Sequence, residues 1–287
     1  MRLMKSSFIF AAPALIFGVA LTCTLAGAQT FQQIDAPGST STTILGINTA
    51  GDMVGAYTDQ NDVGHGFMLS GGVFTTIDVP GATYTAATGL NDNGAVVGFY
   101  SAPSGLFQGF LLSAGTFTTI DYPGARATQL EGINNAGQIV GFFVPQRTPT
   151  TQGFSLKAGK FKVLEPRGST RAQSNGINNT GVVVGSSSRT FSGTSGFQFS
   201  QGTFSSIVFP GATSTIAWGI NDSSQIVGYQ QTGESVVTGF ELQQGTFTTF
   251  VFPGALQTLC FGINASGQIV GYYQGQNLVP HGFLLIP

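Results

Sequence analysis

Short runs of apolar and β-branched residues, separated by polar turn residues, follow one another through residues 29–287. In one stretch these runs cover about Val73–Val79, Tyr84–Leu90, Ala95–Tyr100 and Gly109–Ser113, and their composition is typical of β-strands. Turn chemistry such as Asn91-Asp92-Asn93-Gly94 lies between them. No apolar period of about 3.6 residues, the mark of an amphipathic helix, is present. The pattern therefore predicts an all-β fold.

This pattern of four predicted strands occurs six times along the chain. The phenylalanine that opens each copy recurs at spacings of 43, 43, 44, 43 and 43 residues, at Phe31, Phe74, Phe117, Phe161, Phe204 and Phe247. Two-residue hairpin signals such as Ala114-Gly115 and redirecting Pro-Gly pairs such as Pro80-Gly81 recur with it. The copies use up the whole of residues 29–287, which predicts a single domain.

A four-stranded unit of about 40–50 residues repeated several times is the signature of a β-propeller. We label the strands A to D from the axis outward, so that Tyr84–Leu90 is an A strand and Val73–Val79 a D strand. The region 29–287 begins with a D strand and ends with a C strand. We therefore expect a six-bladed β-propeller, closed by the N-terminal strand pairing with the C-terminal one. A β-solenoid is the alternative, although its ends would need distinct capping repeats.

The first 28 residues differ from the rest. Arg2 and Lys5 precede an apolar run that ends in Ala26-Gly27-Ala28, as in a secretory signal peptide. We expect residues 1–28 to be removed and the remainder to be secreted, periplasmic or displayed at the cell surface. No second long apolar stretch follows, so no membrane span is expected in the mature chain.

Charge and cysteine content restrict the partners. Of the 10 basic residues, Arg2 and Lys5 lie in the signal segment, which leaves 8 basic against 12 acidic residues. This balance argues against a nucleic-acid partner, which requires a basic surface. Cys260 is the only cysteine outside residues 1–28, so no internal disulfide can form, and we interpret it as a small core residue.

The repeats contain sequence motifs such as "GINNAGQIVGFF" and the C-terminal "HGF". In these motifs they resemble the bacterial extracellular repeat family known as HAF repeats, over essentially all of residues 29–287. The resemblance implies export and a repeat fold. It brings no activity and no catalytic residues to this chain.

Two kinds of loop separate the predicted strands. The A–B and C–D turns are short and nearly identical, whereas the B–C loops share almost nothing: "TDQNDVGH", "SAPSGLFQ", "VPQRTPTTQ", "SSRTFSGTS", "QQTGESVVT" and "QGQNLVPH". Variable loops on a rigid frame commonly carry function. We therefore expect a binding site on the D–A/B–C face, near the axis.

One position inside the A strands also differs in every copy. It precedes the Gly-Ile/Leu-Asn motif and is occupied by Leu45, Thr88, Glu131, Asn175, Trp218 and Phe261. Variation there is either packing adjustment between blades or a pocket with an aromatic arc and a polar arc, suited to a small organic ligand. In the second interpretation the only tryptophan, Trp218, offers a stacking surface.

All basic residues outside the signal segment lie between Arg126 and Arg189. We place five of them on the D–A/B–C face: Arg126, Arg147, Arg167, Arg171 and Arg189. These guanidinium groups are either a solvated surface or a site for carboxylate, sulfate or phosphate groups. If the protein is an enzyme, Glu131 with Arg126 and Arg171 is the best acid/base set.

The remaining charged and histidine positions have structural interpretations. Asp35, Asp78, Asp121 and Glu165 share one position at the rim, where charges protect outer strands from edge pairing. His65 and His281 share a position held elsewhere by other hydrogen-bonding residues, and Asp59 to Asp62 lack the pattern of a dedicated calcium loop. The sequence has no nucleotide, zinc or hydrolase motif. We predict neither a metal nor a cofactor.

Three functions are compatible with these observations. The preferred hypothesis is an exported, monomeric, non-enzymatic binding or scaffold protein that recognises extracellular carbohydrate or another surface ligand, such as a protein. The alternative is a polysaccharide lyase or hydrolase with its active site on the same face. The third is a structural role in a cell envelope.

Overall fold

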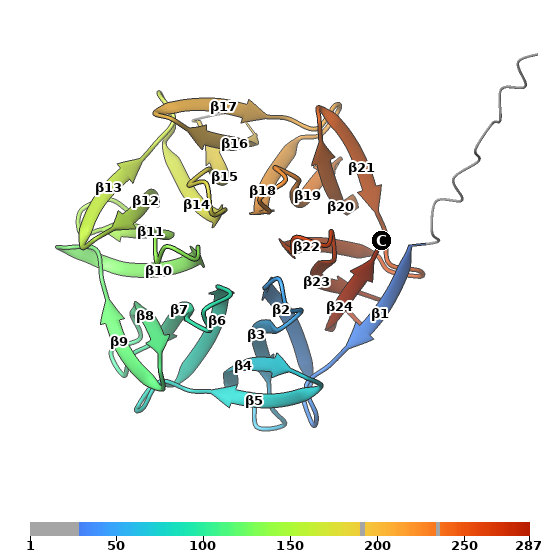
Figure 1. Ribbon diagram of the computed structural model, residues 1–287, viewed down its shortest axis with the longest axis horizontal. Coiled ribbons are helices and arrows are strands. Elements are labelled where there is room, and N and C mark those ends of the chain that lie inside the picture. The colour runs from blue at the N-terminus through green and yellow to red at the C-terminus, as the bar shows by residue number, and fades with distance from the viewer. Residues whose placement is uncertain (1–28, 190–192, 234–235) are drawn as a thin grey trace, which may run out of the picture.

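The computed structural model describes residues 29–189, 193–233 and 236–287, and the predicted signal peptide lies outside these ranges. Figure 1 shows four-stranded units arranged around a central axis, with one edge strand of each unit at the axis and the other at the rim. The predicted all-β architecture of four-stranded sheets is therefore confirmed. Among the described residues no helix is long and apolar enough to cross a membrane.

The two inner strands of each unit form antiparallel pairs across the Asn-containing turns. The A strands are β2 (Ser41–Ile47), β6 (Tyr84–Leu90), β10 (Ala125–Ile133), β14 (Arg171–Ile177), β18 (Ser214–Ile220) and β22 (Gln257–Ile263). The B strands are β3 (Met53–Thr58), β7 (Val96–Ser101), β11 (Ile139–Pro145), β15 (Val183–Ser188), β19 (Ile226–Thr232) and β23 (Ile269–Gln274).

In five units a tight hairpin joins the two outer strands, and in the sixth the outer pair is β24 with β1. The C strands are β4 (Gly64–Ser70), β8 (Phe107–Ser113), β12 (Gln152–Lys157), β16 (Thr194–Ser200), β20 (Val236–Gln243) and β24 (Pro280–Ile286). The D strands are β5 (Val73–Ile77), β9 (Thr116–Ile120), β13 (Lys160–Leu164), β17 (Thr203–Ile207), β21 (Thr246–Phe250) and β1 (Thr30–Ile34). Ala114 and Gly115 both have positive φ, of 47° and 76°, as the predicted hairpin turn requires.

The first and last strands lie side by side. β1 pairs with β24 in antiparallel register, with Phe31 opposite Leu285 and Gln33 opposite Phe283 (Figure 1). The D strand of this unit thus comes from the opposite end of the described chain. The predicted pairing of these two strands is present in the structure.

The core lies between the facing sheets of neighbouring units. Each C strand contributes one phenylalanine that is almost completely buried: Phe67, Phe110, Phe154, Phe197, Phe240 and Phe283. The neighbouring B strand makes room for this ring with a glycine. A Cβ atom on Gly98, for example, would lie 2.8 Å from Cε1 of Phe110. The recurring Gly and Gly-Phe of the repeat are therefore requirements of packing.

Candidate functional site

The variable residue of each A strand is the extra residue of a β-bulge. Between β2 and β3 the pairing passes from Ile44 opposite Gly55 to Gly46 opposite Val54, so that Leu45 has no partner. The same shift flanks Thr88, Glu131, Asn175, Trp218 and Phe261. A bulge breaks the alternation of the strand and redirects one side chain. This geometry explains why a single position can vary without disturbing the ladder.

The bulged residues surround one cavity at the axis. Leu45, Thr88, Glu131, Asn175, Trp218 and Phe261 all line a space of about 80 Å³. The predicted ring of variable residues is therefore brought together. Cavities that hold drug-sized ligands measure about 300–1,000 Å³. This axial cavity can take in only a small chemical group, and a whole sugar ring is too large for it.

The polar bulged side chains also connect neighbouring units. Thr88 donates from Oγ1 to the carbonyl of Leu130 at 2.7 Å, and Asn175 donates from Nδ2 to the carbonyl of Ala217 at 2.9 Å. The other polar atom of Asn175, Oδ1, is buried and has no hydrogen-bond partner. One acceptor on this side of the cavity is therefore unsatisfied.

Glu131 occupies the same bulge position, between Thr88 and Asn175. A carboxylate has no hydrogen to donate, and the Glu131 carboxyl group makes no hydrogen bond with any other described residue. The side chain is only 5% exposed, and burial raises its pKa to about 8. Burial and the nearby charge of Glu131 also raise the pKa of Tyr84, which begins β6. The carboxyl group is thus buried without a counter-charge.

The predicted catalytic partners of Glu131 do not join it. Arg126 and Arg171 are exposed and are absent from the residues that line the axial cavity. The structure therefore does not assemble the three residues into one acid/base set.

The apolar side of the cavity is aromatic. The rings of Trp218 and Phe261 meet edge to face with centroids 4.7 Å apart, and Trp218 stacks on Tyr229 at 6.3 Å. Tyr272 packs against Phe261 at 5.6 Å. Burial raises the pKa of Tyr229 to about 12, so its hydroxyl stays neutral at physiological pH. The predicted aromatic arc is thus extended by two tyrosines of the B strands.

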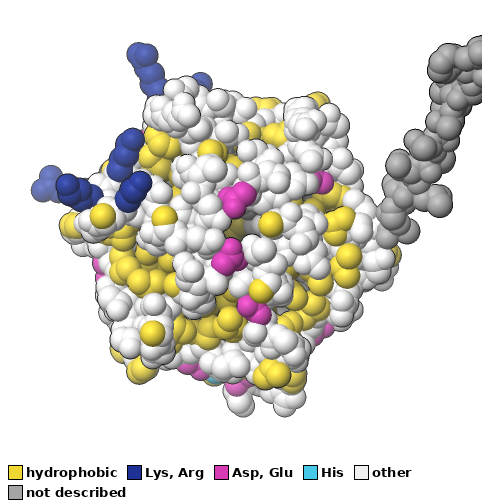
Figure 2. Space-filling model, viewed as in Figure 1, with side chains coloured by type: hydrophobic (Ala, Val, Ile, Leu, Met, Phe, Trp, Pro, Cys, Tyr) yellow, Lys and Arg dark blue, Asp and Glu magenta, His cyan; other side chains and the backbone are white. Residues whose placement is uncertain are grey.

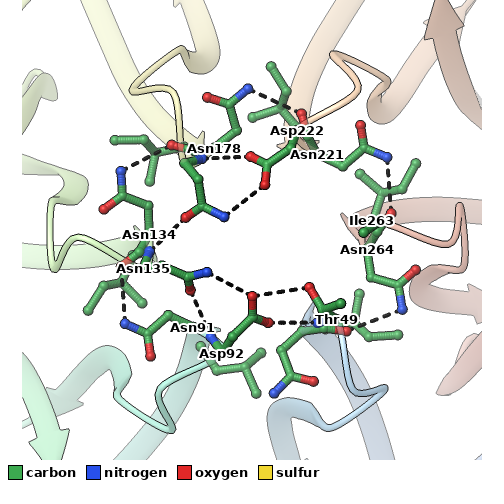
Figure 3. Close-up of a pocket in the computed structure, with 18 residues that line it drawn as sticks. Thr49, Asn91, Asp92, Asn134, Asn135, Asn178, Asn221, Asp222, Ile263 and Asn264 are labelled. Atoms are coloured by element: carbon green, nitrogen blue, oxygen red, sulfur yellow. Dashed lines mark hydrogen bonds between the residues drawn. The ribbon is translucent and has the colours of Figure 1, made fainter.

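A second axial cavity, also of about 80 Å³, lies at the A–B turns (Figure 3). Five of the six turn asparagines donate from Nδ2 to the turn carbonyl of the next unit: Asn91 to Asn134, Asn134 to Asn178, Asn178 to Asn221, Asn221 to Asn264, and Asn264 to Asn48. Asn48 donates instead to Oδ2 of Asp52 in its own turn. The sequence interpretation took these turns as plain. The sequence feature that could have revealed this ring of hydrogen bonds is the asparagine of the Gly-Ile/Leu-Asn motif, which is present in every repeat.

Two aspartates reinforce this ring of turns. Asp92 accepts hydrogen bonds from the backbone N–H of Thr49 at 2.9 Å and from Nδ2 of Asn135 at 2.8 Å. Asp222 accepts from the backbone N–H of Asn179 and from its Nδ2, both at 2.8 Å. Figure 3 shows both carboxylates engaged with neighbouring turns. Their hydrogen-bonding capacity is used to join units.

A third cavity, of about 400 Å³, opens at the rim between the unit β14–β17 and strand β18. It exists because two positions are small in this unit. In two other units the equivalent pairs are aromatic and stack at 3.7 Å, Tyr122 on Phe143 and Phe252 on Tyr273. Here they are Pro166 and Ser187, and both line the cavity. The space is therefore where the stacked pair of those two units would be.

The rim cavity combines apolar, hydroxyl and cationic groups. Phe197 and Phe204 form part of its wall with ring centroids 5.4 Å apart, and Arg189 lies at its edge, where Nη2 donates to the carbonyl of Arg167 at 3.3 Å. Hydroxyl-bearing residues complete the lining: Ser187, Thr194, Ser195, Ser205, Ser206, Thr213 and Thr215. This cavity lies within the sector that carries the basic residues, which gather at one edge of the molecule in Figure 2.

The other arginines of the predicted basic face, Arg126, Arg147, Arg167 and Arg171, are all exposed. None of them lines the rim cavity or either axial cavity. The basic sector is therefore present as a surface, and Arg189 is the member that reaches a cavity.

The rim carboxylates and histidines pair with one another. His281 Nδ1 lies 2.9 Å from Oδ2 of Asp35, and His65 Nδ1 lies 2.9 Å from Oδ2 of Asp78. Asp121 accepts from Nε2 of Gln108, which occupies the histidine position of its unit, also at 2.9 Å. Among the described residues no group of three or more His, Cys, Asp or Glu side chains could hold a metal ion. Cys260 is buried within the core, as expected.

No protein-family model and no curated protein sequence matches the chain. Solved structures do resemble it. The SapL1 lectin in complex with α-methyl fucoside has a TM-score of 0.57 at 10% identity, over 87% of this chain and 94% of the lectin. The fucose-specific lectin from Aleuria aurantia has a TM-score of 0.51 at 12% identity, over 88% and 93% of the two chains. The β-propeller domain of the Trilobed protease from Pyrococcus furiosus has a TM-score of 0.50 at 9% identity, over 85% and 95%. At such identities the likeness is one of fold, and that fold is the β-propeller.

Proposed function

We propose that this chain is a six-bladed β-propeller that is exported and binds carbohydrate without transforming it. The resemblance of the repeats to the HAF family and the N-terminal segment support export. Two of the structures that share the fold are lectins, one described as fucose-specific and one in complex with a fucoside. The monomer remains the proposed state.

The observation that carries the proposal is the rim cavity. Its volume of about 400 Å³ falls within the range of small-ligand sites, whereas each axial cavity is about 80 Å³. Its phenylalanine wall suits the apolar face of a sugar, and its hydroxyl groups suit the polar edge. Arg189 adds a donor that would favour a sugar carrying a carboxylate or sulfate. We therefore place carbohydrate recognition at this cavity, on the D–A/B–C face.

The alternative function, a polysaccharide lyase or hydrolase, receives less support. Its acid, Glu131, lines a cavity too small for a sugar ring, and its two arginines lie outside that cavity. A binding role requires only the rim cavity, whereas catalysis would also require Glu131 and the two arginines to meet at one site.

The chain itself supplies the substitution that tests this site. Tyr57, Tyr100 and Tyr273 occupy the position of Ser187 in other units, so Ser187→Tyr restores the residue of the repeat and fills the cavity. The first measurement is a glycan array with neutral, uronate-containing and sulfated oligosaccharides, followed by calorimetric titration of the best ligand. We expect Ser187→Tyr to lower affinity at least tenfold with no loss of thermal stability.

Gln230→Tyr is the matched control, because it introduces the same residue at the same position of the adjacent unit. It should leave carbohydrate affinity unchanged. Trp218→Ala distinguishes the rim from the axis. If Trp218→Ala abolished binding while Ser187→Tyr had no effect, the carbohydrate site would be axial and the rim assignment would be wrong.

A further inference from the structure

The axial cavity of the bulged residues has a chemical character of its own, which the carbohydrate proposal does not use. Its lining contains one carboxyl group, Glu131, and no basic residue. Oδ1 of Asn175, on a side chain only 2% exposed, is a buried acceptor without a donor. The Glu131 carboxyl group therefore lines a space that holds no basic side chain, whereas Oδ1 of Asn175 has almost no surface exposed to that space. Such groups are costly to bury unless a ligand satisfies them.

The remainder of the lining suits a cation. The rings of Trp218 and Phe261 form the opposite part of the wall, and Tyr229 and Tyr272 pack behind them. The faces of aromatic rings attract ammonium groups. The cavity thus presents a carboxyl group and electron-rich rings.

The floor of the cavity sets the direction of entry. Ile47, Leu90, Ile133, Ile177, Ile220 and Ile263 line both this cavity and the one at the A–B turns, so they lie between the two. A ligand therefore enters from the D–A/B–C face and meets an apolar floor. The volume of about 80 Å³ is well below the roughly 300–1,000 Å³ of sites for drug-sized ligands. A charged head group fits into the cavity, and the rest of the ligand must remain outside it.

We propose that this axial cavity binds a primary alkylammonium group, whose N–H groups donate hydrogen bonds to the Glu131 carboxylate and whose charge lies against the ring of Trp218. A primary ammonium is favoured over a quaternary one because the carboxylate accepts N–H hydrogen bonds that a quaternary group cannot donate. The proposal is independent of carbohydrate binding at the rim.

Binding is coupled to proton release, because Glu131 must be ionised to pair with the ammonium. The groups facing it are few. Tyr84 on β6 is the only other titratable residue with a charge interaction, while β7, β8, β11 and the buried part of β14 present no acidic or basic side chain toward it. Affinity should therefore rise about tenfold per pH unit between pH 6 and pH 7.5 and level off above pH 8.

The single tryptophan lies in the wall of the cavity and reports on binding directly. The probe is n-butylammonium chloride, titrated in phosphate buffer because Tris is itself a primary ammonium. Butan-1-ol serves as the neutral ligand of similar size. We expect a saturable change in Trp218 fluorescence, and heat in a calorimetric titration, with the ammonium and not with the alcohol.

Two variants test the carboxyl group. Glu131→Gln should weaken binding at least tenfold and abolish its pH dependence. Asp121→Asn removes a carboxylate at the rim and should have no effect. No saturable response, equal binding of butan-1-ol, or full affinity in Glu131→Gln would overturn the proposal, whatever the glycan array returns.

Discussion

Asn264 donates from Nδ2 to the carbonyl of Asn48 at 3.2 Å, across a sequence separation of 216 residues. This bond joins the innermost turn of the last repeat to that of the first. Together with the β1–β24 pairing, it ties the two ends of the described chain at both the axis and the rim. The same asparagine joins consecutive repeats elsewhere, for example Asn134 to the carbonyl of Asn178 at 3.0 Å.

The variant Asn264→Asp removes this bond together with the 2.8 Å bond from Nδ2 to Oε1 of Gln268. Aspartate can still accept the hydrogen bonds that Oδ1 receives from the N–H groups of Ser266 and Gln268, but it has no Nδ2 to donate. We expect a loss of about 2 kcal/mol or more in the free energy of unfolding, about 1 kcal/mol for each hydrogen bond. Urea denaturation followed by circular dichroism measures it. Asn221→Asp, at an interior junction, loses the equivalent two bonds, to Gln225 Oε1 and to the Asn264 carbonyl, and should cost a similar amount. A neutral Asn264→Asp beside a destabilising Asn221→Asp would mean that the ends are not joined.

A second prediction concerns the one A–B turn that lacks glycine. Ser224 has φ of 62°, where the equivalent residues of other repeats are glycines, such as Gly94 at 78° and Gly267 at 77°. A left-handed conformation costs a residue with a Cβ atom about 1–2 kcal/mol. Ser224→Gly should therefore raise the melting temperature by about 2 °C or more. Ser223→Gly is the matched control, since Ser223 is not left-handed, and it should lower the melting temperature. A lower value for Ser224→Gly would contradict the turn.

The turn at Ser224 illustrates what the sequence could predict. Strand boundaries and turn types depend on residues that are adjacent in the chain, so alternating apolar runs and glycines at left-handed positions are direct signals. The predicted run Tyr84–Leu90 coincides with β6, and the hairpin at Ala114-Gly115 has the expected dihedral angles. The ring of variable residues could also be predicted, because one repeat position changed while its neighbours did not.

The bulge and the rim cavity were not foreseen, for two physical reasons. A bulge is a property of pairing between two strands, and nothing in a single A strand states that Leu45 lacks a partner. The rim cavity depends on Pro166 and Ser187, which lie on different strands and are both unremarkable alone. Only their juxtaposition with Phe197 and Phe204 creates the space. Arg126 and Arg171 were grouped with Glu131 because all three were assigned to the D–A/B–C face, which does not fix their distance from the axis.

The stacked pair missing from the rim cavity is also incomplete in the next unit. Gln230 occupies the position of Tyr273, its Oε1 is buried without a partner, and the residue across from it is Phe209. Gln230→Tyr should recreate the stacked arrangement of Phe252 and Tyr273 and remove an unsatisfied acceptor. Each effect is worth about 1 kcal/mol, against the loss of the 2.7 Å bond from Gln230 Nε2 to Thr238.

We therefore expect Gln230→Tyr to stabilise the protein by about 1 kcal/mol, measured by thermal and urea unfolding. Gln230→Ala is the comparison, because it removes the same unsatisfied acceptor without adding a ring. If Gln230→Ala stabilised the protein as much as Gln230→Tyr, stacking on Phe209 would not be the cause.

The last prediction is the pH dependence that Glu131 imposes on stability. Burial raises its pKa from 4.5 to about 8, so between these values the folded protein holds a proton that the unfolded chain has released. The stabilising contribution is complete below pH 4.5 and falls as pH rises, by as much as about 1.4 kcal/mol per unit, until it levels off above pH 8.

Other groups titrate in this window, so the informative quantity is the difference in the free energy of unfolding between the wild type and Glu131→Gln. Because glutamine stays neutral, the variant should gain stability relative to the wild type from pH 5 to pH 8. Glu165→Gln, which changes an exposed carboxylate on the rim, should follow the wild-type curve. Parallel curves for the wild type and Glu131→Gln would mean that the carboxyl group is solvated in both states, and the axial cavity would then hold water in place of a ligand.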